Sequence, residues 1–329
     1  MIIYFHLIIL LFPLFHCVEF LTFDLKPSVY GTFSIELCVG SFGFCDDFTL
    51  TFSDYKLKIY ENSIFNPTSN TEGYLNIDIA RTGIYSSLSF PKSKSSIVEV
   101  ESNFISRENP LAKCTIGLSE NSLFVYHIYD LLNSRLFYID TKNKYLLFGD
   151  FPEQYYKRYI NKLKSYKHCA LILKNLPLYS CYVDSIYFNN IIYPIETSVT
   201  FDIGVNAIYV KNKDLLDLIA RTTFATFIEG NICKYKYKDK LYYIECNETF
   251  NYMKEEKLGD VNIIFNMYNI RVLKKDLFIN LNGKLLYMIM YNEDNNNNNG
   301  WVFGSVLFKS NIVIIDKQHN QIGFIPYTK

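Results

Sequence analysis

The stretch WVFGSVLFKSNIVIIDKQHNQIGFIP, from Trp301 to Pro326, carries more information about the fold than any other part of the sequence. Its run VLFKSNIVIID is apolar and rich in β-branched residues, which is typical of a strand. The polar segment KQHNQ follows as a turn, and IGFIP returns as a second strand. The stretch therefore predicts two β-strands joined by a polar turn.

A second apolar run, SVTFDIGVNAIYV from Ser198 to Val210, places one acidic residue at the end of a predicted strand. That residue is Asp202, and Ile203 and Gly204 follow it directly. A glycine in this place lets the chain turn tightly after the strand. Asp202 is therefore the candidate carboxylate of this half of the chain.

The N-terminal half carries similar segments. An alternating run from Val29 to Ser41 is followed by DDFTLTFSDYKLKIY, from Asp46 to Tyr60, and both read as strands. Further strands and turns are predicted in CTIGLSENSLF (114–124), LFYIDTKNKYLLFGDFP (136–152) and YSCYVDSIYFNN (179–190). The spacing of Leu and Ile predicts a helix within residues 211–225.

Taken in order, these segments resemble the pepsin-like aspartic proteases, and the resemblance runs from about Tyr30 to Pro326. It implies a mainly β, bilobal acid-protease fold, in which two pseudo-twofold-related, β-barrel-like lobes enclose a central cleft. The corresponding divisions are a signal peptide at residues 1–17, an N-terminal β lobe at 18–166 and a C-terminal β lobe at 167–329. Ordered matches through both lobes are more specific than any single motif.

Aspartic proteolysis needs two carboxylates that lie close together and share one proton. Because like charges at that distance cannot both ionise, one pKa falls and the other rises. The ionised carboxylate then activates water as a general base, and the protonated one polarises the scissile carbonyl as a general acid. In this family each aspartate opens an Asp-Thr-Gly or Asp-Ser-Gly turn, whose hydroxyls hold the two loops together.

In the C-terminal half, Asp202 and Gly204 match that turn, and the resemblance makes Asp202 the retained family aspartate. Ile203 replaces the Thr or Ser, and Val205 replaces the next hydroxyl residue. Neither side chain can donate a hydrogen bond. This half of the predicted site is therefore poorly preorganised for catalysis.

The N-terminal half departs further from the family. Aligning FTLTF (48–52) with the family strand puts Ser53 at the position of the lost aspartate, with Asp54 one residue late. On a strand, a shift of one residue turns a side chain to the opposite face, although a one-residue bulge would turn it back. Asp54 is otherwise a solvated loop charge. Asn76 aligns with the flap tyrosine of the family, and Tyr74 lies nearby.

Three functions follow from these residues. The first is a catalytically impaired or inactive pseudoenzyme that binds an extended peptide or protein in the interlobe cleft, because losing one member of a catalytic unit removes on the order of 10⁴–10⁶ in rate. The second is an active aspartic endopeptidase that uses Asp202 with a displaced Asp54. The third is an unrelated secreted β-protein of structural or adhesive type.

Composition and the N-terminal segment indicate the class of partner and the cellular location. The 33 Lys+Arg and 33 Asp+Glu cancel, which gives no reason to expect a nucleic-acid partner. The run MIIYFHLIILLFPLFHC is shorter than the roughly 20 residues that span a bilayer, so it predicts a cleaved signal peptide, with a signal anchor as the alternative. We therefore expect a secreted monomer with no membrane contact beyond its signal.

The cysteines support a secretory location. Close pairs in a secreted chain predict disulfides, here Cys233–Cys246, Cys169–Cys181 and Cys38–Cys45, with Cys114 left over and buried thiols as the alternative. Asn247 opens an N-glycosylation sequon. No spacing of Cys and His resembles a metal site, and neither a metal nor a cofactor is expected.

Overall fold

The computed structural model describes residues 20–28, 31–39, 44–53, 57–59, 77–79, 88–89, 114–119, 122–129, 132, 134–150, 167–170, 179–188, 191–256, 258–265, 268–293 and 300–327. The predicted signal peptide and three candidate site residues, Asp54, Tyr74 and Asn76, lie outside these ranges. Strands dominate the described part. None of the helices in it has the length and apolar character needed to cross a membrane.

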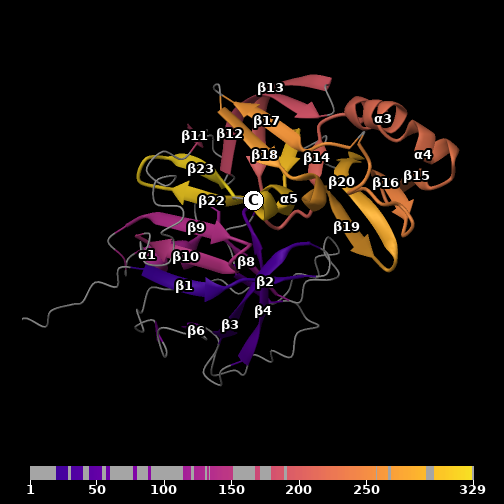
Figure 1. Cartoon of the computed structure of the whole chain (residues 1–329). Helices are drawn as coiled ribbons and strands as arrows, with labels where there is room; N and C mark the ends of the chain where they lie inside the picture. Colours follow the sequence, from indigo (N-terminus) through magenta and orange to yellow (C-terminus); the bar gives the residue numbers. More distant parts are fainter. Residues whose placement is uncertain are drawn as a thin grey trace, which may run out of the picture.

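A six-stranded antiparallel sheet joins the two halves of the chain (Figure 1). Its order is β1 (Phe20–Asp24), β10 (Tyr145–Gly149), β9 (Leu136–Asp140), β22 (Asn311–Asp316), β23 (Gln321–Pro326) and β11 (Lys167–Ala170). The central pair is β9 and β22, in which Val313 lies opposite Ile139. Each half contributes one hairpin and one outer strand, in the mirrored order that a twofold repeat produces.

The two hairpins of this sheet share the same turn chemistry, which supports the repeat. Asp140 ends β9, and its carboxylate accepts from the backbone N–H of Asn143 at 2.9 Å. Asp316 ends β22, and its carboxylate accepts from the backbone N–H of His319, also at 2.9 Å. Both aspartates are buried. Each carboxylate therefore satisfies a turn amide that would otherwise lack a partner.

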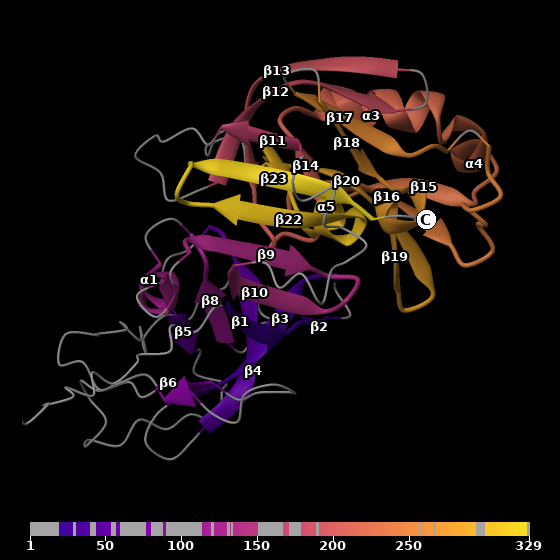
Figure 2. The ribbon, with the colours of Figure 1, turned by 60° about the vertical axis from the view of Figure 1, so that its left-hand side comes forward.

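A seven-stranded sheet forms the N-terminal lobe, below the central sheet in Figure 2. Its order is β5 (Leu57–Ile59), β8 (Cys114–Gly117), β4 (Phe44–Thr51), β3 (Phe33–Val39), β6 (Ile77–Ile79) and β7 (Leu88–Ser89), and β2 (Lys26–Pro27) pairs with β3. β4 and β8 run parallel. The short helix α1 (Leu123–Tyr129) follows β8.

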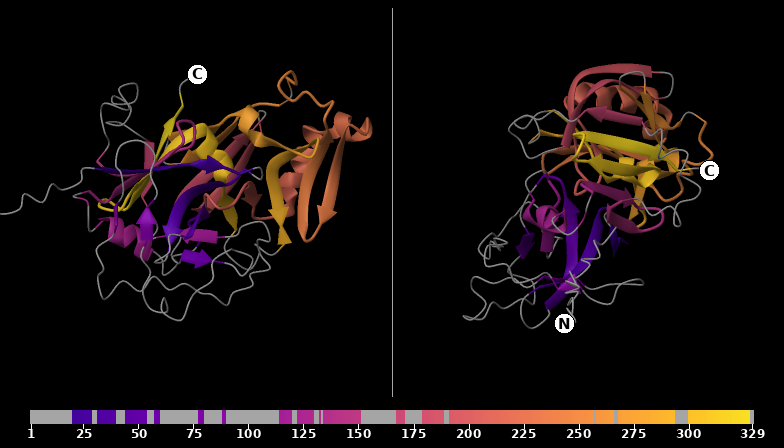
Figure 3. Two further views of the ribbon diagram at one scale, coloured as in Figure 1. Left: turned by 90° about the horizontal axis from the view of Figure 1, so that it is seen from below. Right: turned by 90° about the vertical axis from the view of Figure 1, so that its left-hand side faces the viewer.

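A ten-stranded sheet forms the C-terminal lobe. Its order is β15 (Cys233–Lys238), β16 (Leu241–Asn247), β20 (Lys284–Asn292), β14 (Ile208–Val210), β21 (Trp301–Phe303), β13 (Ile191–Phe201), β12 (Tyr179–Phe188), β17 (Val261–Phe265) and β18 (Tyr268–Val272), and β19 (Phe278–Leu281) pairs with β20. The helices are α3 (Lys213–Thr222), where the helical spacing predicts one, α4 (Ala225–Glu229), the 3₁₀ helix η1 (Lys274–Leu277) and α5 (Ser305–Ser310). The right-hand view in Figure 3 shows the yellow strands of the central sheet between the two lobes.

Two features differ from the sequence-based expectation. The described strands form three open sheets rather than two barrel-like lobes. Residues 311–326 form the predicted hairpin, but residues 306–310, predicted as strand, belong to helix α5. Five of the six residues of α5 are buried. An apolar run buried on all sides has no periodicity that separates a helix from a strand, which explains the error.

The hairpin of β15 and β16 carries the predicted disulfide. Cys233 lies opposite Cys246 in the strand pairing, and the two sulfur atoms are bonded. Cys181 is also disulfide-bonded. The side chain of its predicted partner, Cys169, lies outside the described part. One predicted pairing is therefore confirmed.

Two other cysteine predictions concern the N-terminal lobe. Cys38 and Cys45 are directly opposite each other on β3 and β4, while their side chains lie outside the described part. Cys114 is a buried thiol without a disulfide, and its Sγ lies 4.0 Å from Oδ2 of Asp46. Cys114 therefore forms no disulfide, as expected from the predicted pairing of the other six cysteines.

Candidate functional site

Asp202 lies where the two lobes meet, directly after β13. Its backbone N–H donates to the carbonyl of Phe303 at 3.1 Å, which extends the pairing of β13 with β21 by one residue. Gly304, the residue after β21, lies very close to the loop that follows Asp202, because a Cβ on Gly304 would lie 2.3 Å from the carbonyl oxygen of Val205. Only glycine fits there. The loop that follows Asp202 is therefore fixed by backbone contacts.

The Asp202 carboxylate accepts hydrogen bonds from both lobes. Oδ1 accepts from the backbone N–H of Phe52 at 2.7 Å and from that of Gly204 at 2.9 Å. The hydroxyl of Thr51 lies 3.1 Å from Oδ1 and 3.1 Å from Oδ2. The Thr51 hydroxyl therefore contacts both carboxylate oxygens. The side chain is only 3 % exposed, so these groups replace most of its hydration.

Thr51 is the N-terminal counterpart of Asp202 by strand pairing. On β13, Phe201 pairs in parallel with Phe303, and Asp202 follows. On β4, Leu50 pairs in parallel with Ile116, and Thr51 follows. Gly117 follows Ile116 just as Gly304 follows Phe303, so the strand pairs β4–β8 and β13–β21 have the same register. A hydroxyl thus stands where the pepsin-like arrangement requires the second carboxylate.

This register differs by two residues from the predicted one, which placed Ser53 at the aspartate position. Ser53 instead matches Gly204, because its backbone N–H donates to the hydroxyl of Thr51 at 3.1 Å. Its exposed side-chain hydroxyl lies 2.7 Å from that of Thr51. Ser53, Thr51 and Asp202 therefore form a continuous hydrogen-bonded row. A shift of two residues keeps the same face of a strand, so alternation alone could not separate the two registers.

Buried hydrophobic side chains occupy the positions where pepsin-like proteases have hydroxyl residues. Phe52 and Ile203 follow Thr51 and Asp202, and neither side chain is exposed. The ring of Phe52 lies 4.8 Å from that of Tyr179 and 5.7 Å from that of Phe308, both in edge-to-face geometry. Phe308 belongs to the C-terminal half, so this cluster holds the lobes together. Aromatic pairs of this kind each contribute about 0.5–1.5 kcal/mol beyond their buried area.

Gly204 permits the close contact of the two loops. A Cβ at this position would lie 2.8 Å from the Cβ of Thr51 and 2.9 Å from the carbonyl oxygen of Leu50. Real Cβ atoms do not approach backbone so closely. Gly204 is therefore needed for the close approach of the two lobes as well as for the local turn.

Burial governs the protonation of Asp202. It raises the pKa of this carboxyl above its ordinary value, because ionisation in a dry site is unfavourable. The backbone N–H groups of Phe52 and Gly204 oppose the rise, as do the hydroxyls of Ser53 and Thr51. Burial is the larger effect. Asp202 therefore holds its proton more tightly than an exposed aspartate.

This arrangement lacks the parts of a carboxylate dyad within the described residues. Thr51 presents a neutral hydroxyl, which offers one donor and accepts hydrogen bonds but does not titrate as a carboxyl does. No group of three His, Cys, Asp or Glu side chains in the described part is placed to hold a metal ion. What the site does supply is a buried carboxyl that joins the lobes by accepting from three donors, the backbone N–H groups of Phe52 and Gly204 and the hydroxyl of Thr51.

The remaining predicted site residues are placed only in part. Asp54, Tyr74 and Asn76 lie outside the described residues. Asn247 is exposed at the end of β16, and its Oδ1 accepts from the hydroxyl of Thr249 at 2.6 Å. Thr51 was missed at the sequence level. The signal that could have found it is the shared glycine after the partner strand, Gly117 in one half and Gly304 in the other.

Comparisons with known proteins show the fold. No family model matches the chain, and no curated protein sequence is significantly similar to it. Among solved structures, conglutin gamma, described as a unique basic 7S globulin from lupine seeds, matches with a TM-score of 0.66 and 10% identity over 94% of this chain and 95% of its own. Basic 7S globulin from soybean matches with a TM-score of 0.61 and 11% identity over 93% and 96%. The chain thus has a mainly β, pepsin-like bilobal fold that resembles these globulins.

Proposed function

We propose that this chain is a secreted pepsin-fold protein that binds extended polypeptide segments between its lobes and does not cleave them. The observation that carries the proposal is the hydroxyl of Thr51, 3.1 Å from both oxygens of Asp202. A pepsin-type mechanism requires a carboxylate there to share the proton. With a hydroxyl in that place, no general acid and base pair forms from these two side chains.

The packing around the site supports a binding role. Phe52 and Ile203 replace hydroxyl residues with buried hydrophobic contacts, so the junction of the lobes is kept while the chemistry is lost. An extended peptide can bind such a scaffold through strand-like backbone hydrogen bonds, which need no catalytic residue. The Cys233–Cys246 disulfide agrees with secretion, because disulfides persist in oxidising compartments.

The experiment is incubation of the disulfide-intact protein with an unfolded, carboxymethylated protein at acidic and neutral pH. Complex formation is followed by biolayer interferometry, and the mass of the unfolded protein is followed by mass spectrometry. We expect reversible binding with the mass unchanged. Cleavage that disappears in the Asp202→Asn protein would contradict the loss of catalysis. Absence of any complex at micromolar concentrations would contradict the binding role.

A further inference from the structure

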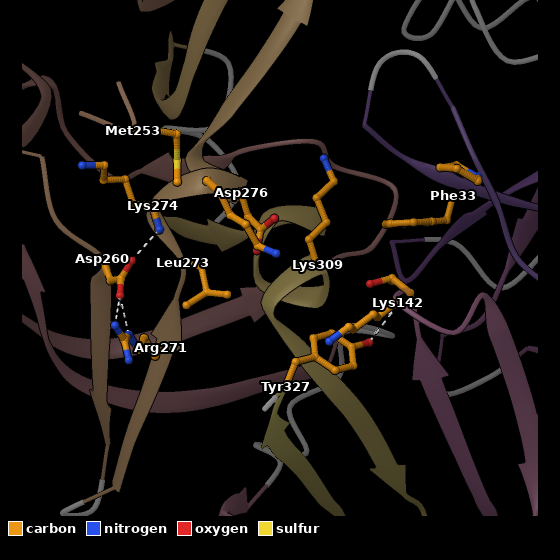
Figure 4. Close-up of a pocket in the computed structure, with 13 residues that line it drawn as sticks. Phe33, Lys142, Met253, Asp260, Arg271, Leu273, Lys274, Asp276, Lys309 and Tyr327 are labelled. Atoms are coloured by element: carbon orange, nitrogen blue, oxygen red, sulfur yellow. Dashed lines mark hydrogen bonds and ion pairs between the residues drawn. The ribbon is translucent and has the colours of Figure 1, made fainter. Parts of the chain in front are cut away.

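A cavity of about 700 Å³ lies away from Asp202, between the two halves of the chain. Pro27, Phe33 and the turn after β9 contribute from the N-terminal half, while β18, η1 and α5 contribute from the C-terminal half. Figure 4 shows Lys309 between Phe33 on one wall and Asp276 on the other. No residue that lines the cavity contacts the Asp202 carboxylate. The cavity is thus separate from the site described above.

The cavity is strongly cationic although the whole chain is neutral. Five cationic side chains and two carboxylates line it, which leaves an excess of three positive charges: Lys142, Arg271, Lys274, Lys275 and Lys309 against Asp260 and Asp276. The chain as a whole has a formal net charge of zero. A cavity lined by one sign of charge concentrates ligands of the opposite sign.

Both carboxylates are already engaged by protein groups. Asp260 pairs with Arg271 and accepts from the backbone N–H of Lys274 at 2.6 Å. Asp276 accepts from the hydroxyl of Ser310 at 2.7 Å. These contacts fix the acidic groups in place. Around the cavity the cationic side chains still outnumber the carboxylates by three.

Two of the ammonium groups are available to a ligand. Lys275 and Lys309 make no hydrogen bond or ion pair within the part of the chain that the structure describes. Lys309 extends from α5, and its Nζ lies 2.9 Å from the point where a Cβ on Gly31 would stand. Burial lowers the pKa of Lys309, while the charge of Asp276 raises it. An anion beside Lys309 would compensate for the hydration that this ammonium has lost.

Apolar groups complete the cavity. Phe33, Met253 and Leu273 line it beside the cationic groups, and 57% of Met253 is exposed. The volume falls within the range of about 300–1,000 Å³ that is usual for small-molecule sites. We propose that this cavity binds a small organic anion, whose carboxylate, phosphate or sulfonate group contacts Lys309 and Lys275 and whose apolar body contacts Phe33 and Met253.

The test uses naphthalene-1-sulfonate as the anionic probe and naphthalene-1-sulfonamide as its uncharged counterpart, with inorganic phosphate as a third probe. Isothermal titration calorimetry on the full chain gives the affinities. We expect the sulfonate to bind at least about ten times more tightly than the sulfonamide, because charge-assisted hydrogen bonds exceed neutral ones. Phosphate is expected to compete with the sulfonate, since both need the ammonium groups.

Variants locate the site. Lys309→Gln and, independently, the exposed Lys275→Gln are each expected to weaken sulfonate binding about tenfold, while Lys309→Arg keeps the charge and the affinity. Lys234→Gln, at an exposed lysine on β15, serves as the matched control and is expected to bind like wild type. Equal affinity for sulfonate and sulfonamide, no binding at millimolar probe, or equal affinity of the Lys275 and Lys234 variants would each overturn the proposal.

Discussion

Replacing Thr51 by valine removes one hydroxyl and keeps the size and the branching of the side chain. The Thr51 hydroxyl lies 3.1 Å from Oδ2 of Asp202. After the substitution the carboxyl loses this donor while it stays buried, because Asp202 is only 3 % exposed. A neutral hydrogen bond contributes about 0.5–1.5 kcal/mol and one to a charged group about 1.5–3 kcal/mol. We therefore expect Thr51→Val to lower the free energy of unfolding by about 1–3 kcal/mol.

The loss should depend on pH. The Thr51 hydroxyl favours the ionised form of Asp202, so its removal raises the pKa of Asp202 further. The cost should then lie nearer the upper end of the range at neutral pH than in acid, because the unfolded carboxyl is ionised at neutral pH and the lost hydroxyl favoured the ionised form. Urea denaturation of the disulfide-intact protein at both pH values measures the difference.

A matched control is available on the same strand. Thr49 also lies on β4 and is half-buried, but its hydroxyl does not contact Asp202. Thr49→Val should change the free energy of unfolding by no more than about 0.5 kcal/mol. Equal losses in the two variants would refute the reasoning, because the effect would then belong to the strand and not to the carboxylate.

Three further predictions concern the same chain. Because the folded-state pKa of Asp202 is raised, its contribution to stability is complete below the unfolded pKa of about 3.9 and is lost as the pH rises through the folded value. Urea titrations should therefore show wild type losing stability relative to Asp202→Asn as the pH rises. Replacing both Cys233 and Cys246 by serine should lower the free energy of unfolding by about 2–4 kcal/mol in non-reducing denaturation, since the bridge closes a loop of 13 residues. Expression in a eukaryotic secretory host should attach a glycan at Asn247, seen as a mass shift that a glycosidase removes and that Asn247→Gln and Thr249→Ala both abolish.

Each of these three predictions has a result that would contradict it. A wild-type protein that gains stability over Asp202→Asn with rising pH would show that the hydrogen bonds outweigh burial and that the pKa is depressed. Unchanged stability in the double serine variant would show that the hairpin is held by its strand pairing alone. A mass shift that persists in Asn247→Gln would place the glycan elsewhere.

Much of the fold followed from local patterns in the sequence. The hairpin of β22 and β23 comes from β-branched residues on both sides of a polar turn, and the Cys233–Cys246 disulfide from the closeness of the two cysteines in the sequence. Helix α5 could not be predicted in this way, because its residues are buried on nearly all sides and show no periodicity. The shared role of Asp140 and Asp316 in the two turns was not predicted, since the likeness of the turns appears only when the central sheet aligns them.

The candidate site was likewise predicted only in part from local sequence patterns. Asp202 and Gly204 stand out locally, as an acidic residue and a glycine after an apolar strand. The position opposite Asp202 does not, because Thr51 and Ser53 share one face of β4 and only the pairing of β4 with β8 decides between them. Long-range pairing is a property of the assembled sheet. A single strand pattern carries no information about it.

The central claim of the proposal is that, among the described residues, Asp202 faces the hydroxyl of Thr51 and not a second carboxylate, so that the chain does not cleave polypeptides. The most direct test is the ratio of cleavage rates of wild type and Asp202→Asn on an unfolded protein substrate between pH 2 and pH 7. A working dyad would lose on the order of 10⁴-fold or more in the variant. The account predicts a ratio of one, with both proteins at background. A wild-type rate far above the variant, blocked by a transition-state analogue of peptide hydrolysis, would contradict it.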